Sequence, residues 1–255
     1  MLRLLEQEEQ ELFEFCKQDV FGTKIAAYSA TYGMAYPFAT FYLQRSNSTV
    51  TAAVSKIDDA MTLCCAEDAD FEELATFVRA IGFNTLMCTA GVCDKLNLKP
   101  QKTGFIVEFQ DQPIPSDFQN IFLSNSFELS DIYDILQHAE FDGLAEKGPW
   151  LADVASRVKK GTATAKIVSE ATVPVACAMI LFETPVGVLI GAVATVPTFR
   201  GKGYAGALVT SLATSAKANN KRVELLCAKS GILDFYKKLG FVNTGEWVLI
   251  VGREG

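Results

Sequence analysis

Residues 191–206 read GAVATVPTFRGKGYAG. Small and β-branched residues, which favour a strand, run up to Pro197, and three glycines then crowd into six positions close to Arg200 and Lys202. Glycines so close together allow sharp turns and leave backbone N–H groups open to a ligand, while the two cations indicate an anionic ligand. The stretch therefore predicts a phosphate-binding loop.

The sequence on either side places this loop between a buried strand and a helix. Residues 173–197 are the longest apolar stretch, but the turn residues of 183–187 (ETPVG) interrupt it, so it predicts two strands and a hairpin rather than a membrane helix. Further strands are expected at 162–170, 223–228 and 241–252, and helices at 131–140, 149–160, 203–219 and 231–239. This order predicts an α/β fold with a mixed, mostly antiparallel sheet flanked by helices. An anion at the start of the 203–219 helix would meet unpaired N–H groups and the positive end of the helix dipole.

Composition limits the function classes. The 255 residues are 49% hydrophobic and 21% charged, which is typical of a globular protein with room for two domains. Residues 1–125 hold 9 Lys and Arg against 17 Asp and Glu, and residues 126–255 hold 14 against 13, so the expected anion site belongs to the less acidic half. Basic stripes with interleaved aromatic residues are missing from the sequence, which gives no support for nucleic-acid binding.

Histidine and cysteine usage narrows the chemistry further. The single histidine, His138, leaves no partner for Ser/His/Asp, Cys/His or zinc arrangements, so no metal is expected. Seven scattered cysteines without a CxxC pair predict reduced, buried thiols. Residues 1–15 predict an acidic amphipathic helix, which is unlike a secretory signal or an Arg-rich transit peptide. Together these features predict a cytoplasmic protein.

Two kinds of phosphate-binding loop compete for the glycines. Gly201, Gly203 and Gly206 spell GxGxxG, and Glu224 lies at about the distance of the ribose-binding acid of a dinucleotide fold. In that fold, however, the strand leads directly into the first glycine and the acid closes the next strand. Here PTFR intervenes, Glu224 opens its strand, and too little chain follows to complete such a domain.

The alternative accounts for the downstream sequence as well. VPTFRGKGYAGALV, then LLCA, then FYKKLGFV, resembles the GNAT superfamily of acetyl-CoA-dependent N-acetyltransferases over residues 126–255. The family signature is Arg/Gln-x-x-Gly-x-Gly/Ala after a strand that ends in proline, followed by Tyr-x-x-x-Gly-Phe. The matching positions are Arg200, Gly203, Ala205, Tyr236, Gly240 and Phe241.

The resemblance implies a cosubstrate, acetyl-CoA, and an amine acceptor. It implies cofactor contacts for Ala194, Thr195, Val196, Arg200, Gly201, Lys202, Gly203, Tyr204, Ala205 and Ser230, and it makes Tyr236 the acid that protonates the departing thiolate. Ser230 departs from the family, which commonly has asparagine there. No base is assigned, because Glu170, Glu183 and Glu246 are candidates only by elimination. A non-catalytic protein that binds acetyl-CoA is the alternative.

Residues 1–125 look like a degenerate copy of the same plan. LMCTAGVCDKLNLKPQKTGF, from Leu86, parallels LLCAKSGILDFYKKLGF, from Leu225. Three expected strands, at 38–46, 49–57 and 60–67, and an expected helix at 70–82 precede the first of these segments. At the position of the phosphate loop stands AEDADFEE (residues 66–73), whose carboxylates would repel a pyrophosphate. We therefore expect a degenerate GNAT-like domain over 1–125 that binds no CoA, and an acetyl-CoA-binding GNAT domain over 126–255.

Overall fold

The chain folds into two compact units, described in a computed structural model over residues 1–7, 10–110, 118, 120–228 and 230–252. The first unit comprises Met1–Val107, Leu226–Leu233 and Asn243–Gly255, and the second comprises Glu108–Leu225 and Asp234–Val242. Four elements therefore contribute residues to both units: β6 (Lys102–Phe109), β10 (Arg222–Cys227), α8 (Ser230–Lys238) and β11 (Phe241–Val251).

The first unit is built around strands in the order β1-β2-β3-β4-β5-β11-β6. Its own strands are β1 (Leu2–Leu4), β2 (Ala39–Ser46), β3 (Thr49–Ile57), β4 (Ala60–Cys65) and β5 (Thr85–Thr89). Strand β11 completes the sheet by pairing antiparallel with β5, from Trp247 opposite Thr89 to Val251 opposite Thr85. The last strand of the sequence thus belongs to the sheet of the N-terminal half.

Helices cover both faces of this sheet. They are α1 (Gln10–Phe15), α2 (Val20–Tyr32), α3 (Phe71–Ile81) and α4 (Ala90–Lys95). Leu63 of β4 packs in one core with Leu74 and Val92, from α3 and α4. The next residue, Cys64, interacts with Asp19, the N-cap of α2. Because successive residues of a strand point to opposite faces, α2 lies on the face away from α3 and α4.

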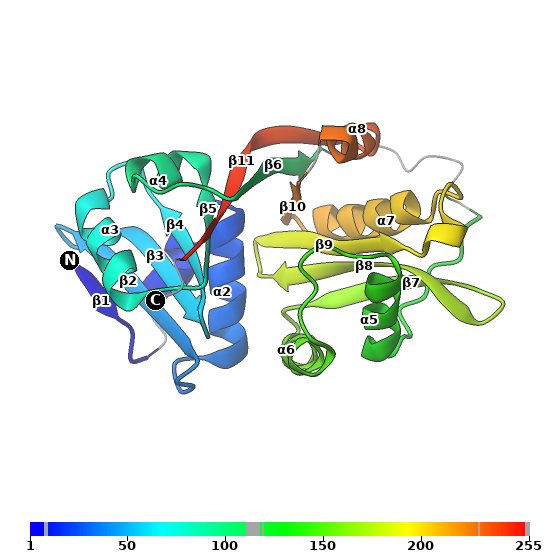
Figure 1. The fold of residues 1–255 in the computed structure, drawn as a ribbon, viewed down its shortest axis with the longest axis horizontal. Helices are drawn as coiled ribbons and strands as arrows, with labels where there is room; N and C mark the ends of the chain where they lie inside the picture. The colour runs from blue at the N-terminus through cyan, green and yellow to red at the C-terminus, as the bar shows by residue number, and fades with distance from the viewer. Residues whose placement is uncertain (8–9, 111–117, 119, 229, 253–255) are drawn as a thin grey trace. The chain divides into compact units, whose positions relative to one another are not determined.

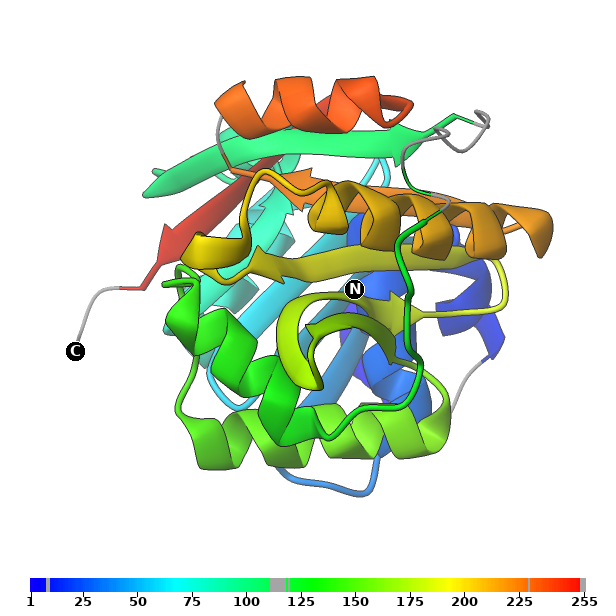
Figure 2. The same cartoon turned by 90° about the vertical axis from the view of Figure 1, so that its right-hand side faces the viewer.

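The second unit has the strand order β10-β9-β8-β7, with β7 (Thr164–Glu170), β8 (Val173–Glu183) and β9 (Gly187–Thr195). Its helices are α5 (Leu129–His138), α6 (Lys147–Lys160) and α7 (Tyr204–Ala218). Ala165 and Ile167 of β7 share a core with α5 and α6, whereas Lys166, between them, donates to Ser211 of α7 at 2.7 Å. The sheet of the second unit is therefore sandwiched between α5–α6 and α7 (Figures 1 and 2).

The predicted fold class is confirmed. Of the strand pairs whose register is described, β4–β5 and β9–β10 are parallel and the others are antiparallel. The apolar stretch of 173–197 forms the antiparallel strands β8 and β9, as its turn residues predict. Within the described residues, no helix combines the length and the apolar character needed to cross a membrane.

The two halves of the sequence repeat one order of elements. Each half contains, in this order, two helices, three antiparallel strands, a helix, a strand parallel to the third strand, and a short helix. The first series runs from α1 to α4 and the second from α5 to α8. The predicted helix over residues 1–15 is wrong in its first part. Leu2–Leu4 pair as β1 with Tyr42–Gln44 of β2, so that apolar residues near the start complete a sheet edge, and the helix begins only at Gln10.

Candidate functional site

The glycine-rich loop joins the end of β9 to the start of α7. A short 3₁₀ turn, Pro197–Phe199, leads into Gly201 and Gly203, which both have φ of 82°. This left-handed conformation costs residues with a Cβ about 1–2 kcal/mol, so glycine is favoured at both positions. Gly203 is the N-cap of α7 and has no side chain to cap the helix. The first N–H groups of α7 therefore point out of the helix without an intrahelical acceptor.

A pocket of about 470 Å³ lies against this loop, within the second unit. Figure 2 shows β9 leading through the short turn into α7, which runs back along the strand. The described lining residues come from the segment after α5, the end of β9, the loop, the start of α7 and α8. They are Ala139, Phe141, Val193, Ala194, Thr195, Phe199, Arg200, Gly201, Lys202, Gly203, Tyr204, Ala205, Gly206 and Phe235.

One edge of β9 opens beside the pocket. The parallel register between β9 and β10 ends at Ile190 and Leu225, although β9 continues to Thr195. Ala192 has φ of 49°, and the β8–β9 register shifts nearby, so the strand bends where the parallel pairing ends. On the side toward β8, pairing continues to Thr195 opposite Ala176. The last part of β9 thus presents one backbone edge to a ligand.

The predicted cofactor residues separate into two groups. Ala194, Thr195 and the loop residues from Arg200 to Ala205 all line the pocket. Val196 and Ser230 are not among its described lining residues. The Val196 N–H donates to the carbonyl oxygen of Val175 at 2.9 Å, and Ser230 is an exposed residue that begins α8.

The two cations of the loop have different partners. Arg200 donates to the carbonyl oxygens of Thr195, at 3.2 Å, and Ala139, at 3.4 Å, and so ties together two walls of the pocket. Lys202 forms an ion pair with Glu170 at 2.5 Å, and the Tyr204 hydroxyl donates to the same carboxylate oxygen. Hydrogen bonds from Lys202 and Tyr204 hold the pKa of Glu170 below its usual range. The bond to Glu170 raises the pKa values of Lys202 and Tyr204.

Tyr236 lies in α8 next to a lining residue. Its residue surface is 6% exposed, and its ring contacts those of Phe235 and Phe241, with centroids 5.1 Å and 5.7 Å away. Phe235 is the residue of α8 that lines the pocket. The structure therefore brings α8 to the pocket and packs Tyr236 in an aromatic cluster beside it.

The three carboxylates considered as bases occupy unlike places. Glu170, the last residue of β7, is bound to Lys202 and Tyr204 at the loop. Glu183, the last residue of β8, pairs with Lys221 at 2.6 Å. Glu246 is an exposed residue of β11. Asp and Glu are absent from the pocket lining that the structure describes.

Several aromatic and small residues of the site carry no local sequence signal. Ala139 and Phe141 reach the pocket from the segment after α5. The Phe118 ring packs on the start of α7, so close that a Cβ added to Gly206 would lie only 2.5 Å from the ring. Each belongs to a segment distant in sequence from the loop, so only the folded chain shows that they meet there.

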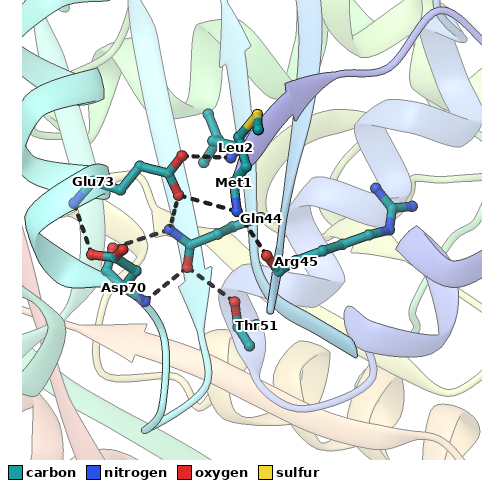
Figure 3. Close-up of polar contacts among 7 residues, drawn as sticks. All are labelled: Met1, Leu2, Gln44, Arg45, Thr51, Asp70 and Glu73. Carbon is teal, nitrogen blue, oxygen red and sulfur yellow. Dashed lines mark hydrogen bonds and ion pairs between the residues drawn. The ribbon is translucent and has the colours of Figure 1, made fainter. Parts of the chain in front are cut away.

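The corresponding position of the first unit is filled by its own side chains (Figure 3). Asp70 caps α3 by accepting from the Glu73 N–H at 2.9 Å. Gln44, 1% exposed, donates to the Asp70 carbonyl and the Glu73 carboxylate, and accepts from the Asp70 N–H and the Thr51 hydroxyl. The start of α3 is therefore capped by amide and carboxylate groups, unlike the start of α7.

Comparisons with known proteins agree with this geometry. Residues 163–243 match the family model described as "Acetyltransferase (GNAT) domain". No curated protein matches the sequence.

Solved structures of the same fold cover nearly the whole chain. A GCN5-related N-acetyltransferase from Sphaerobacter thermophilus aligns with a TM-score of 0.62 at 14% identity, over 97% of this chain and 94% of its own. A GNAT-family acetyltransferase from Colwellia psychrerythraea gives 0.58 at 10% identity, over 100% of both chains. A tandem GNAT protein from the clavulanic acid biosynthesis pathway gives 0.57 at 13% identity, over 98% of this chain and 97% of its own. Residues 163–243 of this chain are therefore a domain of the GNAT acetyltransferase family.

Proposed function

We propose that the second unit binds acetyl-CoA and transfers its acetyl group to a primary amine, either of a small molecule or of an amino-terminal group. One observation carries the proposal: a single pocket is lined both by the uncapped start of α7 and by the end of β9, where the pairing with β10 has stopped. Acetyl-CoA offers a group for each feature, a diphosphate for the helix start and an amide-bearing arm for the strand edge. The GNAT family match supports this assignment.

The diphosphate would bind at the N–H groups of residues 201–205. Gly201 and Gly203 leave the backbone accessible, and the helix dipole of α7 adds a partial positive charge. Arg200 and Lys202 supply formal charge beside it. A structural turn would account for the glycines, and an anionic ligand would in addition be attracted by the two cations in the pocket wall.

The pantetheine arm would lie along the open edge of β9. Its amides can pair with backbone groups as an added strand pairs with a sheet edge, and Ala194 and Thr195 line the pocket there. The open edge would end at Val196, because the N–H of Val196 already donates to the carbonyl oxygen of Val175.

In the chemical step, the neutral amine nitrogen attacks the thioester carbon, the carbon–sulfur bond breaks, and the thiolate takes up a proton. We propose Tyr236 as the donor of that proton. A phenol, with an ordinary pKa near 10, is protonated at neutral pH and can serve a thiolate whose conjugate acid has a pKa of about 8–9. The nitrogen loses its extra proton to a base that we leave unassigned.

One observation favours a second candidate, a protein that binds acetyl-CoA without turning it over. The pocket lining described by the structure contains no carboxylate, and Glu170 beside it is bound to Lys202 and Tyr204. A water relay would provide for an enzyme without a nearby carboxylate, whereas a binding protein needs no base.

Calorimetry and product analysis on the full chain test both candidates. Titration with acetyl-CoA should give one bound molecule per chain, because the helix start of the first unit is capped by Asp70 and Gln44. The chain is then incubated with acetyl-CoA and a panel of polyamines, amino sugars, amino acids and peptides with free amino termini, and CoA release is followed by chromatography. Release that depends on the amine, with an acetylated product by mass spectrometry, supports the enzyme. Binding without such release supports the second candidate, and an absence of binding contradicts both.

A further inference from the structure

Glu170 brings a negative charge to the loop where an anion is expected. The Nζ atom of Lys202 lies 2.5 Å from its Oε1 atom, and the Tyr204 hydroxyl donates to the same oxygen. Lys202 stands between the two left-handed glycines, and Tyr204 is the first residue of α7. A single carboxylate oxygen therefore holds donors from both the loop and the helix start.

The hairpin between β7 and β8 fixes Glu170 in this place. Glu170 pairs with Val173, and the two residues between them, Ala171 and Thr172, have φ of 47° and 74°. Two left-handed residues in succession make the tight hairpin turn whose twist matches that of the flanking strands. The short turn therefore holds the backbone of Glu170 close to the loop.

The surroundings of Lys202 show what Glu170 does to the loop. The ammonium group of Lys202 lies 5.2 Å from the centre of the Phe199 ring and forms an ion pair with Glu170. Arg200, the other cation of the pocket lining, donates to the carbonyl oxygens of Thr195 and Ala139. One of the two cations in the pocket lining is therefore engaged by an internal anion.

Building on the acetyl-CoA site proposed above, we propose that Glu170 is an internal competitor for the cofactor diphosphate. Glu170 holds Lys202 and Tyr204 until the diphosphate takes over their hydrogen bonds. Once the diphosphate is bound, the negative charge of Glu170 repels it. Affinity for CoA is in this way kept below what the loop alone would give, which favours release of the product CoA.

The substitution Glu170→Gln tests this competition, with CoA itself as the probe. Glutamine keeps an acceptor oxygen for Tyr204 but removes the charge. Since exposed ion pairs and a like charge a few ångströms away each contribute modestly in water, we expect roughly three- to tenfold tighter binding by calorimetry at low salt. The gain should shrink at high salt.

Asp134→Asn is the matched control. Asp134 pairs with Lys147 at 2.6 Å, with side chains 46% and 45% exposed, and neither residue is among the described lining of the pocket. The control changes the net charge by the same amount as Glu170→Gln, so unchanged CoA affinity in Asp134→Asn shows that the effect is local. An equal gain in both variants would overturn the proposal, because it would reflect net charge alone.

A second substitution separates competition from positioning. Lys202→Met should weaken CoA binding, and adding Glu170→Gln to it should recover less than Glu170→Gln gains in the parent, because no ammonium remains to be released. If the parent binds CoA and Glu170→Gln binds it equally well, the proposed competition is wrong. If Glu170→Gln binds CoA more weakly, the proposal is also wrong, and Glu170 instead orients Lys202 for the phosphate. If the parent binds no CoA, the proposed function itself fails.

Discussion

Ile190 and Leu225 are the last residues in register between β9 and β10. Five further residues of β9 follow Ile190, and in the same stretch Ala192 adopts a left-handed conformation. The strand thereby leaves its parallel neighbour while it stays paired with β8. This separation gives the loop at its end a pocket, and the first two predictions concern that pocket.

Gly203→Val should weaken CoA binding roughly tenfold or more, because a β-branched side chain would stand in the path of the phosphate and displace charge-assisted hydrogen bonds. Calorimetry measures the loss. Gly161→Val is the matched control: Gly161 also has a left-handed backbone, with φ of 73°, and its added Cβ would meet open space. Both variants should lose about 1–2 kcal/mol of stability from backbone strain. Equal CoA affinity in the two variants would show that the loop does not bind the phosphate.

Tyr236→Phe should lower turnover by roughly 10²-fold while CoA affinity changes little, because only the proton donor is lost and the ring keeps its packing. Rates are compared with the best acceptor from the amine panel, under conditions where chemistry limits the rate. Tyr133→Phe is the control, since its buried hydroxyl donates to the Ala145 carbonyl at 3.0 Å and Tyr133 is not among the described pocket lining. That variant should lose stability and keep its turnover. A Tyr236→Phe protein as fast as the parent would make Tyr236 a packing residue.

Thr172→Gly should stabilise the protein by about 1 kcal/mol, because glycine adopts a φ of 74° without the strain that a Cβ brings. Ser48, with φ of 71° in the β2–β3 turn, should respond to glycine in the same way. Thr164→Gly, in the extended strand β7, should instead destabilise. Thermal unfolding compares the three variants. A loss of stability in Thr172→Gly would mean that contacts of the threonine side chain outweigh its backbone strain.

The protein should lose stability as the pH rises above about 9. Burial raises the pKa of Cys177 to about 12, and its Sγ donates to the Ala192 carbonyl at 3.4 Å. In the unfolded chain this thiol ionises near its ordinary pKa of about 8.5, so stability is full below that pH and falls by up to about 1.4 kcal/mol per pH unit toward 12.

Cys177→Ala checks this pH dependence. Denaturant unfolding between pH 8 and pH 10.5 should give a shallower decline for the variant than for the parent, although other buried thiols contribute to both. Between pH 6 and pH 8 the two curves should run parallel. Identical slopes at high pH would mean that Cys177 ionises as readily in the folded protein as in the unfolded chain.

Much of the fold follows from local patterns in the sequence. The strands β2, β3, β4, β7, β8 and β9 and the helices α3 and α7 lie where the apolar pattern and turn residues predict them. Two elements depend on distant partners: Leu2–Leu4 pair as a strand with the edge of β2, and β11 pairs with β5 far back in the sequence. The β7–β8 turn is local, but it consists of Ala171 and Thr172, which are not typical residues of such turns.

The residues of the candidate site likewise divide into those that the sequence predicts and those that only the folded chain brings together. The glycines, the cations and the strand end can be predicted, because their chemistry is contained in one contiguous stretch. The ion pair between Lys202 and Glu170, and the packing of Phe118 on Gly206, join segments that only tertiary structure brings together. The resemblance to the GNAT superfamily also implies that Tyr236 is an acid, but the sequence carries no information on the aromatic cluster that surrounds the ring.

The place of β11 has a consequence for synthesis on the ribosome. Strand β5 is paired with β4 on one edge and with residues 247–251 on the other, so the second edge has no partner until those residues have been translated. Nascent chains would carry an open, apolar strand edge during that interval, and such edges recruit strands from other chains. Chaperone protection should therefore matter most while residues 90–246 are being made, and slowed translation over that region should increase aggregation of the N-terminal half.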